Sequence, residues 1–282
     1  MMALNRQETL SLTADEFNYV CQFAYDNAGI VLNQSKQEMV YRRFTRIVRE
    51  RKLPSFSAYC RLLQAQPERE KNYFINAITT NLTSFFREQH HFDFLSQHEL
   101  PRLLEANKAN KRIRIWSSAS STGEEAYSIA MVLSEALGKT LSNWDAKILA
   151  TDIDSNVLQT AKSGIYSLDS IEGVPKNLKN KYFRKGCEQQ TGQSRVSNAL
   201  QKYITFKQLN LLSSWPMRGP FDIIFCRNVI IYFDKETQSR LFERYYNMLA
   251  PGGLLILGHS ENLGAYQQYF ECVGRTIFRR PN

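Results

Sequence analysis

The sequence predicts an α/β protein in which an all-helical N-terminal domain precedes a Rossmann-like domain with a mainly parallel sheet. Helix start and stop signals follow one another through about the first hundred residues, without strand-like alternation. After Lys111, short apolar runs alternate with helical stretches, as in βαβ units. A polar stretch at 166–206 interrupts this alternation and predicts a small antiparallel β insertion. We place the two domains at 1–85 and 86–282.

Local signals define the N-terminal helices. Thr13–Glu16 and Ser35–Glu38 have the form of capping boxes, in which each side chain satisfies a free backbone donor at a helix start. Gly29 is placed to end the first helix, and Ser55 to cap the third. Pro67 stands where a fourth helix would begin.

The second half contains the predicted sheet. Strands are expected at 112–119, 147–154, 221–226, 254–257 and 275–279, and a helix at 124–137 that Gly138 closes. The strand-like run YITF at 203–206 ends the predicted insertion. Two carboxylates, Asp152 and Asp154, end the second strand.

Composition excludes several classes of protein. The chain has 282 residues and 43% hydrophobic residues, enough for a sizeable core and up to two domains. We expect neither a secretory signal nor a membrane span, because residues 1–12 have no apolar region and no apolar run approaches the ~20 residues that a span needs. Its five cysteines are scattered and its four histidines are poorly spaced as ligands, so we expect a cytosolic protein without disulfides or a metal.

The chain is basic, with a net charge of +9. This balance suggests an acidic partner, which could be nucleic acid, an anionic membrane surface or an acidic protein face. Arg42, Arg46 and Arg49 share one face of a predicted helix whose opposite face is apolar. The pattern fits either a solvated face or a docking surface.

The loop between the first strand and its helix indicates the kind of ligand. It reads Ser120-Ser121-Thr122-Gly123-Glu124-Glu125, with one glycine and two carboxylates. A dinucleotide site would need a glycine-rich loop, and carboxylates at a helix start repel phosphate. S-adenosylmethionine is cationic and has no phosphate, and Asp152 is placed to accept hydrogen bonds from ribose hydroxyls. The two glutamates could equally serve only the helix dipole.

Seven collinear motifs resemble those of the chemotaxis receptor methyltransferase (CheR) family. They are TTNLTSFFRE (79–88), IWSSASSTGEEAYSIAM (115–131), ATDID (150–154), SGIY (163–166), LNLL (209–212), FDIIFCRNVIIYFD (221–234) and GGLLILGHSENL (252–263). The resemblance covers nearly the whole chain and implies a class I S-adenosylmethionine-dependent methyltransferase fold. Small departures occur at Ser118–Ser120, where the family commonly has glycine, alanine or cysteine, and at Ala126, where proline is usual.

The resemblance also implies a site. The expected cofactor-binding residues are Asn81, Thr83, Arg87, Glu124, Asp152, Asn210, Leu211, Arg227 and Asn228. Arg87 and Tyr232 are the expected catalytic residues, which orient the substrate carboxylate or the sulfonium side of the cofactor. The structural alternatives are a surface ion pair for Arg87 and a packed core position for Tyr232.

The implied reaction transfers a methyl group from S-adenosylmethionine to glutamate carboxylates of chemotaxis receptors and leaves S-adenosylhomocysteine. A glutamate with a pKa near ~4.3 is already ionised at neutral pH, so no general base is needed. The expected partner is the cytoplasmic helical domain of membrane receptors, docked on Arg42, Arg46 and Arg49. A receptor tail peptide could add to the β insertion. The enzyme would be cytoplasmic and recruited to receptor arrays, without insertion into the membrane.

Rival functions are less well supported by the sequence. Methyltransferases of base amino groups usually carry N/D-P-P-aromatic after the fourth strand, where this chain has Arg227-Asn228-Val229-Ile230. Nucleic acid is therefore not the expected partner. A non-catalytic receptor-binding module would not need Arg87, Glu124 and Asp152 together. A nicotinamide dehydrogenase would need the glycine fingerprint that the first loop lacks.

Overall fold

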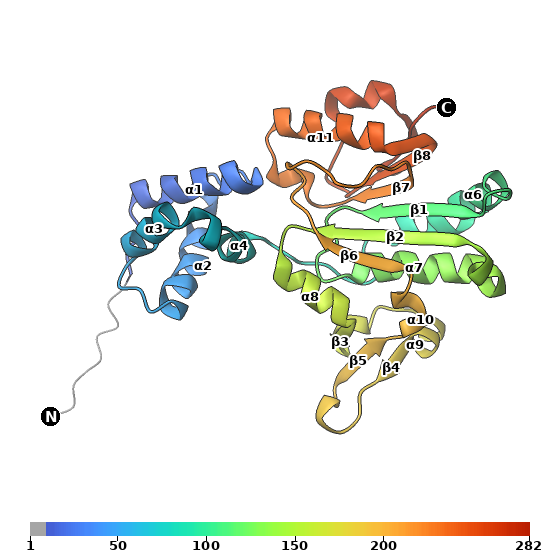
Figure 1. Ribbon diagram of the computed structural model, residues 1–282, viewed down its shortest axis with the longest axis horizontal. Helices are drawn as coiled ribbons and strands as arrows, with labels where there is room; N and C mark the ends of the chain where they lie inside the picture. The colour runs from blue at the N-terminus through green and yellow to red at the C-terminus, as the bar shows by residue number, and fades with distance from the viewer. Residues whose placement is uncertain (1–9) are drawn as a thin grey trace. The chain divides into compact units, whose positions relative to one another are not determined.

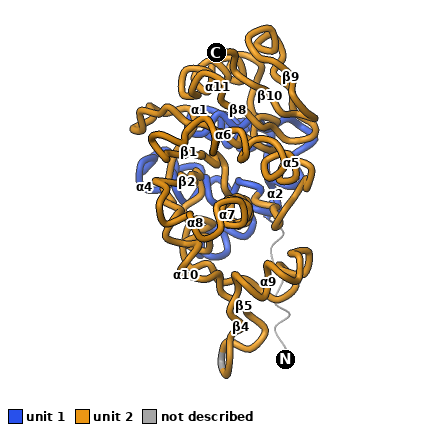
Figure 2. The backbone as a smooth tube through the Cα atoms, turned by 90° about the vertical axis from the view of Figure 1, so that its right-hand side faces the viewer, with its two compact units in different colours: residues 1–80 blue, residues 81–282 orange. Residues whose placement is uncertain are grey.

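The computed structural model describes residues 10–282 and divides the chain after Thr80 into two compact units, which Figure 2 distinguishes by colour. The sequence analysis places the domain boundary after residue 85. The first unit is helical, and the second contains both sheets. No helix in residues 10–282 is long and apolar enough to cross a membrane.

The described part of the first unit, residues 10–80, contains four α-helices: α1 (Ala14–Ala28), α2 (Gln37–Glu50), α3 (Phe56–Ala65) and α4 (Pro67–Ile78). The capping box at Thr13, the helix end at Gly29 and the cap at Ser55 are present as predicted. The prediction of a second capping box, at Ser35–Glu38, is wrong. Ser35 lies inside a 3-10 turn and its hydroxyl donates to Asn33 Oδ1. Glu38 instead accepts a hydrogen bond from Arg42 Nε.

Aromatic side chains fill the core of the helical unit. The ring of Phe74 on α4 lies 4.8 Å from that of Phe23 and 5.3 Å from that of Phe44, centroid to centroid. Phe44 belongs to the apolar face of α2, which is buried as its spacing predicts. The opposite face is open to solvent, since the Arg42 and Arg46 side chains are 76% and 80% exposed.

The second unit is built on a seven-stranded sheet, drawn in Figure 1. Its strands are β1 (Arg112–Ser117), β2 (Asp145–Asp152), β6 (Ile204–Gln208), β7 (Phe221–Cys226), β8 (Leu249–Leu257), β9 (Glu271–Gly274) and β10 (Ile277–Arg279). The order is β6-β2-β1-β7-β8-β10-β9, and the pairings are parallel except for those of β10, which is antiparallel to both β8 and β9. The chain leaves β1 toward β2 and later returns to its other side as β7. Open sheets of this kind bind ligands at such a switch point, beyond the carboxyl ends of the strands.

Side chains alternate between two buried layers. On β7, Ile223 and Phe225 join a core with α7 (Glu124–Leu137), whereas Ile224 and Cys226 join a core with α11 (Lys235–Met248). Both faces of β7 are buried, as in central strands of parallel sheets. Figure 1 shows α7 and α11 beside this sheet. The shorter helices are α5 (His90–Phe94), α6 (Leu100–Ala106), α8 (Ser155–Ser163), α9 (Lys176–Tyr182) and α10 (Asn198–Gln201).

The predicted insertion contains a three-stranded antiparallel sheet in the order β3-β5-β4, formed by β3 (Ile165–Ser167), β5 (Gln193–Val196) and β4 (Phe183–Lys185). The YITF run does not belong to it. Its last three residues begin β6, which pairs in parallel with β2 in the large sheet. Other strands also differ from expectation: β8 begins at Leu249, and β9 was not predicted. The second strand ends at Asp152, so Asp154 does not belong to it and instead caps α8.

Candidate active site

The loop after β1 is held by its two neighbouring strands. Ser118 donates from its backbone N and from its hydroxyl to Phe225 O, each at 2.9 Å. Ser120 N donates to Thr151 O on the other side, also at 2.9 Å. Gly123 ends the loop with a φ of +98°, and a Cβ there would lie 2.8 Å from Ala161 Cβ. Only glycine therefore fits the turn into α7.

Asp152 lies at the carboxyl end of β2, where the sequence placed it. Its carboxylate accepts hydrogen bonds from Ser121 N at 2.8 Å and Asp154 N at 3.0 Å. The side chain is almost fully buried, and burial raises its pKa to about 6. A buried acceptor of this kind is suited to ligand hydroxyls that replace its lost hydration.

Asn81 and Asp154 connect the first segment of the unit to this loop. Asn81 Nδ2 donates to Asp154 Oδ2 at 2.7 Å, and Ser121 Oγ donates to Asn81 O at 2.8 Å. Asp154 is buried and also caps α8 through the backbone N of Asn156. The predicted cofactor residues Asn81 and Asp152 thus share one hydrogen-bonded cluster. Neither Asp154 nor Ser121 is among the residues predicted for the site.

The two neighbouring glutamates of the first loop have different contacts. Glu124 accepts a hydrogen bond from Thr122 Oγ1 at 2.6 Å, and burial raises its pKa. Glu125 accepts from Ser117 Oγ at 2.7 Å and pairs with Arg227 Nη1 at 2.9 Å. Glu124 is therefore the carboxylate of this loop that can bind a ligand, whereas Glu125 forms an ion pair with Arg227.

Arg227 ties three segments together behind the site. Its side chain is 3% exposed and pairs with Glu125, while its Nη2 lies 3.5 Å from Glu88 Oε2. The same nitrogen donates to the backbone oxygen of Arg87. Arg227 was predicted to bind the cofactor. These contacts indicate that it fixes the segment carrying Arg87 against α7 and the end of β7.

Arg87 stands in a strained stretch of backbone. The residues on either side, Phe86 and Glu88, have φ values of +55° and +58°, which non-glycine residues seldom adopt. Phe86 N donates to Ser128 Oγ at 3.0 Å, which anchors the stretch on α7. The Arg87 side chain is half-buried and donates to Leu82 O at 2.8 Å rather than to a carboxylate. Strain of this kind is stored at functional sites.

Glu88 organises the polar groups next to Arg227. It accepts a hydrogen bond from His259 Nδ1 at 3.0 Å. Burial opposes its ionisation, but the His259 hydrogen bond and the Arg227 charge outweigh burial and lower its pKa to about 2. Burial, together with Arg227, lowers the pKa of His91 to about 3, so this imidazole is neutral.

Glu88, His90 and His91 each place one possible metal ligand within 4.8 Å of the other two. The guanidinium of Arg227 lies 3.5 Å from Glu88 Oε2. A metal cation bound to that oxygen would be repelled by the arginine. We therefore assign no metal to this cluster.

The other predicted residues follow β6 and β7. Leu209 N donates to Asp152 O at 2.9 Å, which brings the next residues, Asn210 and Leu211, to the end of β2. Asn228 has a φ of +57°, and its Nδ2 lies 3.4 Å from Glu88 Oε1. Tyr232 ends a 3-10 turn, half-buried, so it is not a core tyrosine.

Thr83 is also half-buried, in the segment that begins at Asn81. The predicted cofactor and catalytic residues all lie in the second unit. Contacts join most of them through the loops at the switch point.

The donor set fits S-adenosylmethionine. Glu124 and Asp152 provide buried carboxylates for ammonium and hydroxyl groups, and the first loop has no glycine-rich cradle for phosphate. Ser120 Oγ is buried and has no hydrogen-bond partner among the described residues. Buried polar groups are normally hydrogen-bonded, so a polar group of a bound ligand can pair with this hydroxyl. When bound, S-adenosylmethionine supplies an electrophilic methyl group.

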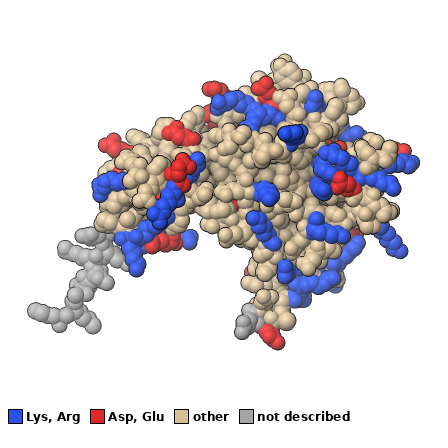
Figure 3. Space-filling model, viewed as in Figure 1, with Lys and Arg blue, Asp and Glu red and all other residues tan. Residues whose placement is uncertain are grey.

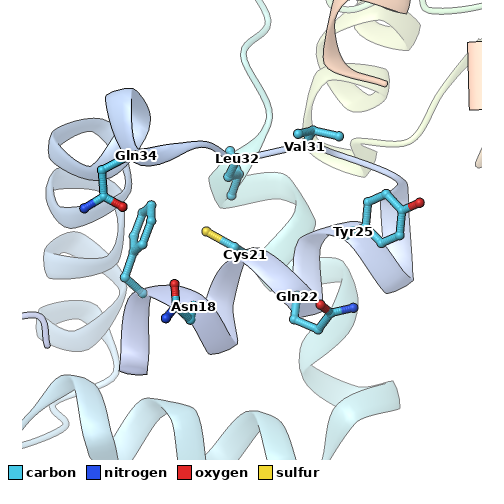
Figure 4. A pocket seen from close by; sticks show the side chains of 8 residues that line it. Asn18, Cys21, Gln22, Tyr25, Val31, Leu32 and Gln34 are labelled. Atoms are coloured by element: carbon cyan, nitrogen blue, oxygen red, sulfur yellow. The ribbon is translucent and has the colours of Figure 1, made fainter. Parts of the chain in front are cut away.

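A separate pocket of about 490 Å³ lies in the helical unit. Figure 4 shows its lining by α1 and the segment after it: Phe17, Asn18, Cys21, Gln22, Tyr25, Val31, Leu32 and Gln34. None of the predicted site residues lines it. It is not part of the candidate active site.

Comparison with known proteins decides the family. Residues 81–279 match the model described as CheR methyltransferase, SAM binding domain, and residues 15–79 match the all-alpha domain of the same family. The chain belongs to the CheR methyltransferase family. The family prediction and the predicted fold class, a class I methyltransferase domain after a helical domain, are confirmed.

CheR family relatives match over nearly their full length. The chemotaxis protein methyltransferase of Salmonella typhimurium is 43% identical over 98% of this chain and 93% of its own. That of Escherichia coli is 42% identical over 98% and 94%. Chemotaxis protein methyltransferase 2 of Pseudomonas aeruginosa is 43% identical over 94% and 93%. The chain is an S-adenosylmethionine-dependent methyltransferase, as predicted.

Proposed function

We propose that this CheR family enzyme transfers the methyl group of S-adenosylmethionine to glutamate side chains of chemotaxis receptors. The relatives are chemotaxis protein methyltransferases that match over almost the whole chain, both domains included. The observation that carries the proposal is the carboxylate-lined switch point, where Glu124 and Asp152 are buried beside a strained Arg87 segment. The product is a glutamyl methyl ester, which removes one negative charge from the receptor.

Methyl transfer requires the protein to position the cofactor and the acceptor carboxylate rather than to transfer a proton. A glutamate acceptor is ionised at neutral pH, with a pKa near ~4.3, so it is already a nucleophile. Asn81, Asp152 and Glu124 hold the cofactor. Arg87 and Tyr232 orient the acceptor carboxylate, which must be aligned with the methyl carbon and the leaving sulfur. Arg87 also offsets the negative charge that approaches the site.

We assign receptor docking to the exposed arginine face of α2, which comprises Arg42, Arg46 and Arg49. Arg42 pairs with Glu38 at 2.8 Å and Arg46 with Glu50 at 2.7 Å. Exposed ion pairs one helical turn apart contribute little to stability, so an acidic receptor helix can compete for these arginines. Figure 3 shows Lys and Arg side chains, with acidic ones beside them, in the region of α2.

The three-stranded sheet offers a second contact with receptors. Its outer strands, β3 and β4, each pair on one side only, with β5. A free strand edge can accept an extended peptide by main-chain hydrogen bonds. We assign this edge to a receptor tail peptide. The enzyme then works in the cytoplasm and is recruited to receptor arrays by these two contacts.

The product identifies the acceptor group. Purified protein, methyl-labelled S-adenosylmethionine and a receptor signalling domain are incubated, and the labelled receptor is then exposed to mild base. Label released as volatile methanol is the expected result, because a carboxyl methyl ester hydrolyses in base. Base-stable label would indicate nitrogen methylation and contradict the proposal. Cofactor binding without any transfer would instead favour a non-catalytic receptor-binding module.

A further inference from the structure

One buried carboxylate beyond the predicted residues holds the loop that follows β7. Glu261 is 6% exposed and accepts four backbone hydrogen bonds. Its Oε1 accepts from Val229 N at 2.9 Å and Ile230 N at 2.8 Å. Its Oε2 accepts from Asn228 N at 2.8 Å and Gly258 N at 2.7 Å. Three consecutive amides of one loop thus converge on a single side chain.

This loop carries three residues predicted for the site, Arg227, Asn228 and Tyr232. Asn228, its second residue, has a φ of +57°, which is unusual for a non-glycine residue. The loop then passes directly into the 3-10 turn Ile230–Tyr232, where Tyr232 N donates to Val229 O at 3.2 Å. The amides bound by Glu261 continue into the first residue of this turn, Ile230, so the carboxylate fixes the position of the turn that carries Tyr232.

We infer that Glu261 is a positioning residue for methyl transfer, which acts through the backbone of residues 228–230 on Tyr232. The inference rests on the proposed function and adds a residue to it. Four donors on two oxygens use the acceptor capacity of a carboxylate, and no other side chain of this length provides it. In Gln, an NH₂ group would replace one oxygen and face two backbone N–H donors. The loop would have to move.

The neighbouring glycine supports the same account. A Cβ on Gly258 would lie 2.6 Å from Asn228 Nδ2, 2.8 Å from Glu261 Oε2 and 2.9 Å from Asn228 N. Alanine at 258 would therefore push against both the loop and the carboxylate that holds it. The loop, the Glu261 carboxylate and Gly258 are therefore closely packed.

The test is a double-mutant cycle with the full-length enzyme, a receptor signalling domain and labelled S-adenosylmethionine. Glu261→Gln should lower kcat by about 100-fold, as a displacement of about 1 Å does in an active site. In a Tyr232→Ala background the same change should cost less than about 5-fold, because the group through which Glu261 acts is already gone. Glu271→Gln, an exposed carboxylate on β9, is the matched control and should leave kcat unchanged.

A purely structural role would give independent, multiplicative losses in the two backgrounds, and that outcome overturns the inference. So does a Glu261→Gln enzyme with the wild-type kcat. If Glu261→Gln does not fold, as judged by urea unfolding followed by tryptophan fluorescence, Gly258→Ala replaces it in the same cycle and must show the same non-additive loss. A wild-type enzyme that forms no base-labile product would overturn the proposed function itself, before any variant is compared.

Discussion

Removing the charge of Arg227 should destabilise the second unit strongly. The Arg227 side chain is 3% exposed and that of Glu125 is 10% exposed, with 2.9 Å between Nη1 and Oε2. Arg227→Met keeps an unbranched but shorter apolar side chain and leaves the Glu125 carboxylate buried without its ion-pair partner. Breaking a buried pair from one side costs about 3–5 kcal/mol. Glu88, whose pKa depends on the Arg227 charge, adds to the loss.

Urea unfolding followed by tryptophan fluorescence measures this loss of stability in the second structural unit. Trp116, Trp144 and Trp215 are the three tryptophans of the chain, and all lie in residues 81–282. The matched control is Arg240→Met on α11, an exposed arginine that should change the free energy of unfolding by less than about 0.5 kcal/mol.

The double variant Arg227→Met/Glu125→Gln separates charge from packing. It should regain part of the lost stability, because the unpaired buried charge of Glu125 is removed with its partner. A loss below about 1 kcal/mol for Arg227→Met would refute the account of this ion pair. A double variant no more stable than Arg227→Met would refute it as well.

Three further predictions concern Asp152, Arg87 and the docking face. Burial raises the pKa of Asp152 from 3.8 to about 6, so its protonated form stabilises the fold and that contribution is lost as pH rises. Between pH 4 and pH 7, the free energy of unfolding of Asp152→Asn in urea should therefore rise by about 2 kcal/mol relative to that of wild type. A difference between the two proteins that does not change with pH would contradict the raised pKa. Arg87→Ala should slow receptor methylation by about 100-fold or more without altering the unfolding curve, and normal turnover would disprove its role. Arg42→Glu/Arg46→Glu should weaken receptor methylation at unchanged affinity for S-adenosylhomocysteine by calorimetry, whereas loss of both would indicate misfolding.

Local patterns predicted the parts of the site that depend on one segment. Asp152 ends a strand and Glu124 begins a helix, so their positions at the edge of the sheet follow from the alternation of elements. Arg87 was assigned from a motif. The strain at Phe86 and Glu88 that marks its segment is visible only in the backbone dihedral angles.

Partners distant in the chain could not be predicted in this way. Glu125 and Arg227 are 102 residues apart, and Asn81 and Asp154 are 73 apart. Glu261 belongs to the motif at 252–263, but nothing in the neighbouring sequence indicates that it accepts hydrogen bonds from the backbone N–H groups of residues 228–230. A single sequence specifies residue types and local periodicity, whereas these contacts depend on how the strands are ordered.

The misassigned elements have similar causes. A short apolar run such as that at 203–206 does not reveal its partner strand, and β2 pairs with it because the chain returns beside the large sheet. The pattern at Ser35–Glu38 matched a capping box, but Asn33 and Arg42 compete for its two side chains. Tertiary and neighbouring contacts outweighed the local signal in both cases.

Mass spectrometry of receptor peptides after reaction tests the central claim most directly. A receptor signalling domain is incubated with the enzyme and S-adenosylmethionine, digested, and searched for added methyl groups. We expect the methyl group on glutamate side chains, produced by the wild-type enzyme and nearly absent with Arg87→Ala. Methylation of lysine or arginine, or an unmodified receptor with a cofactor-bound enzyme, would contradict the account.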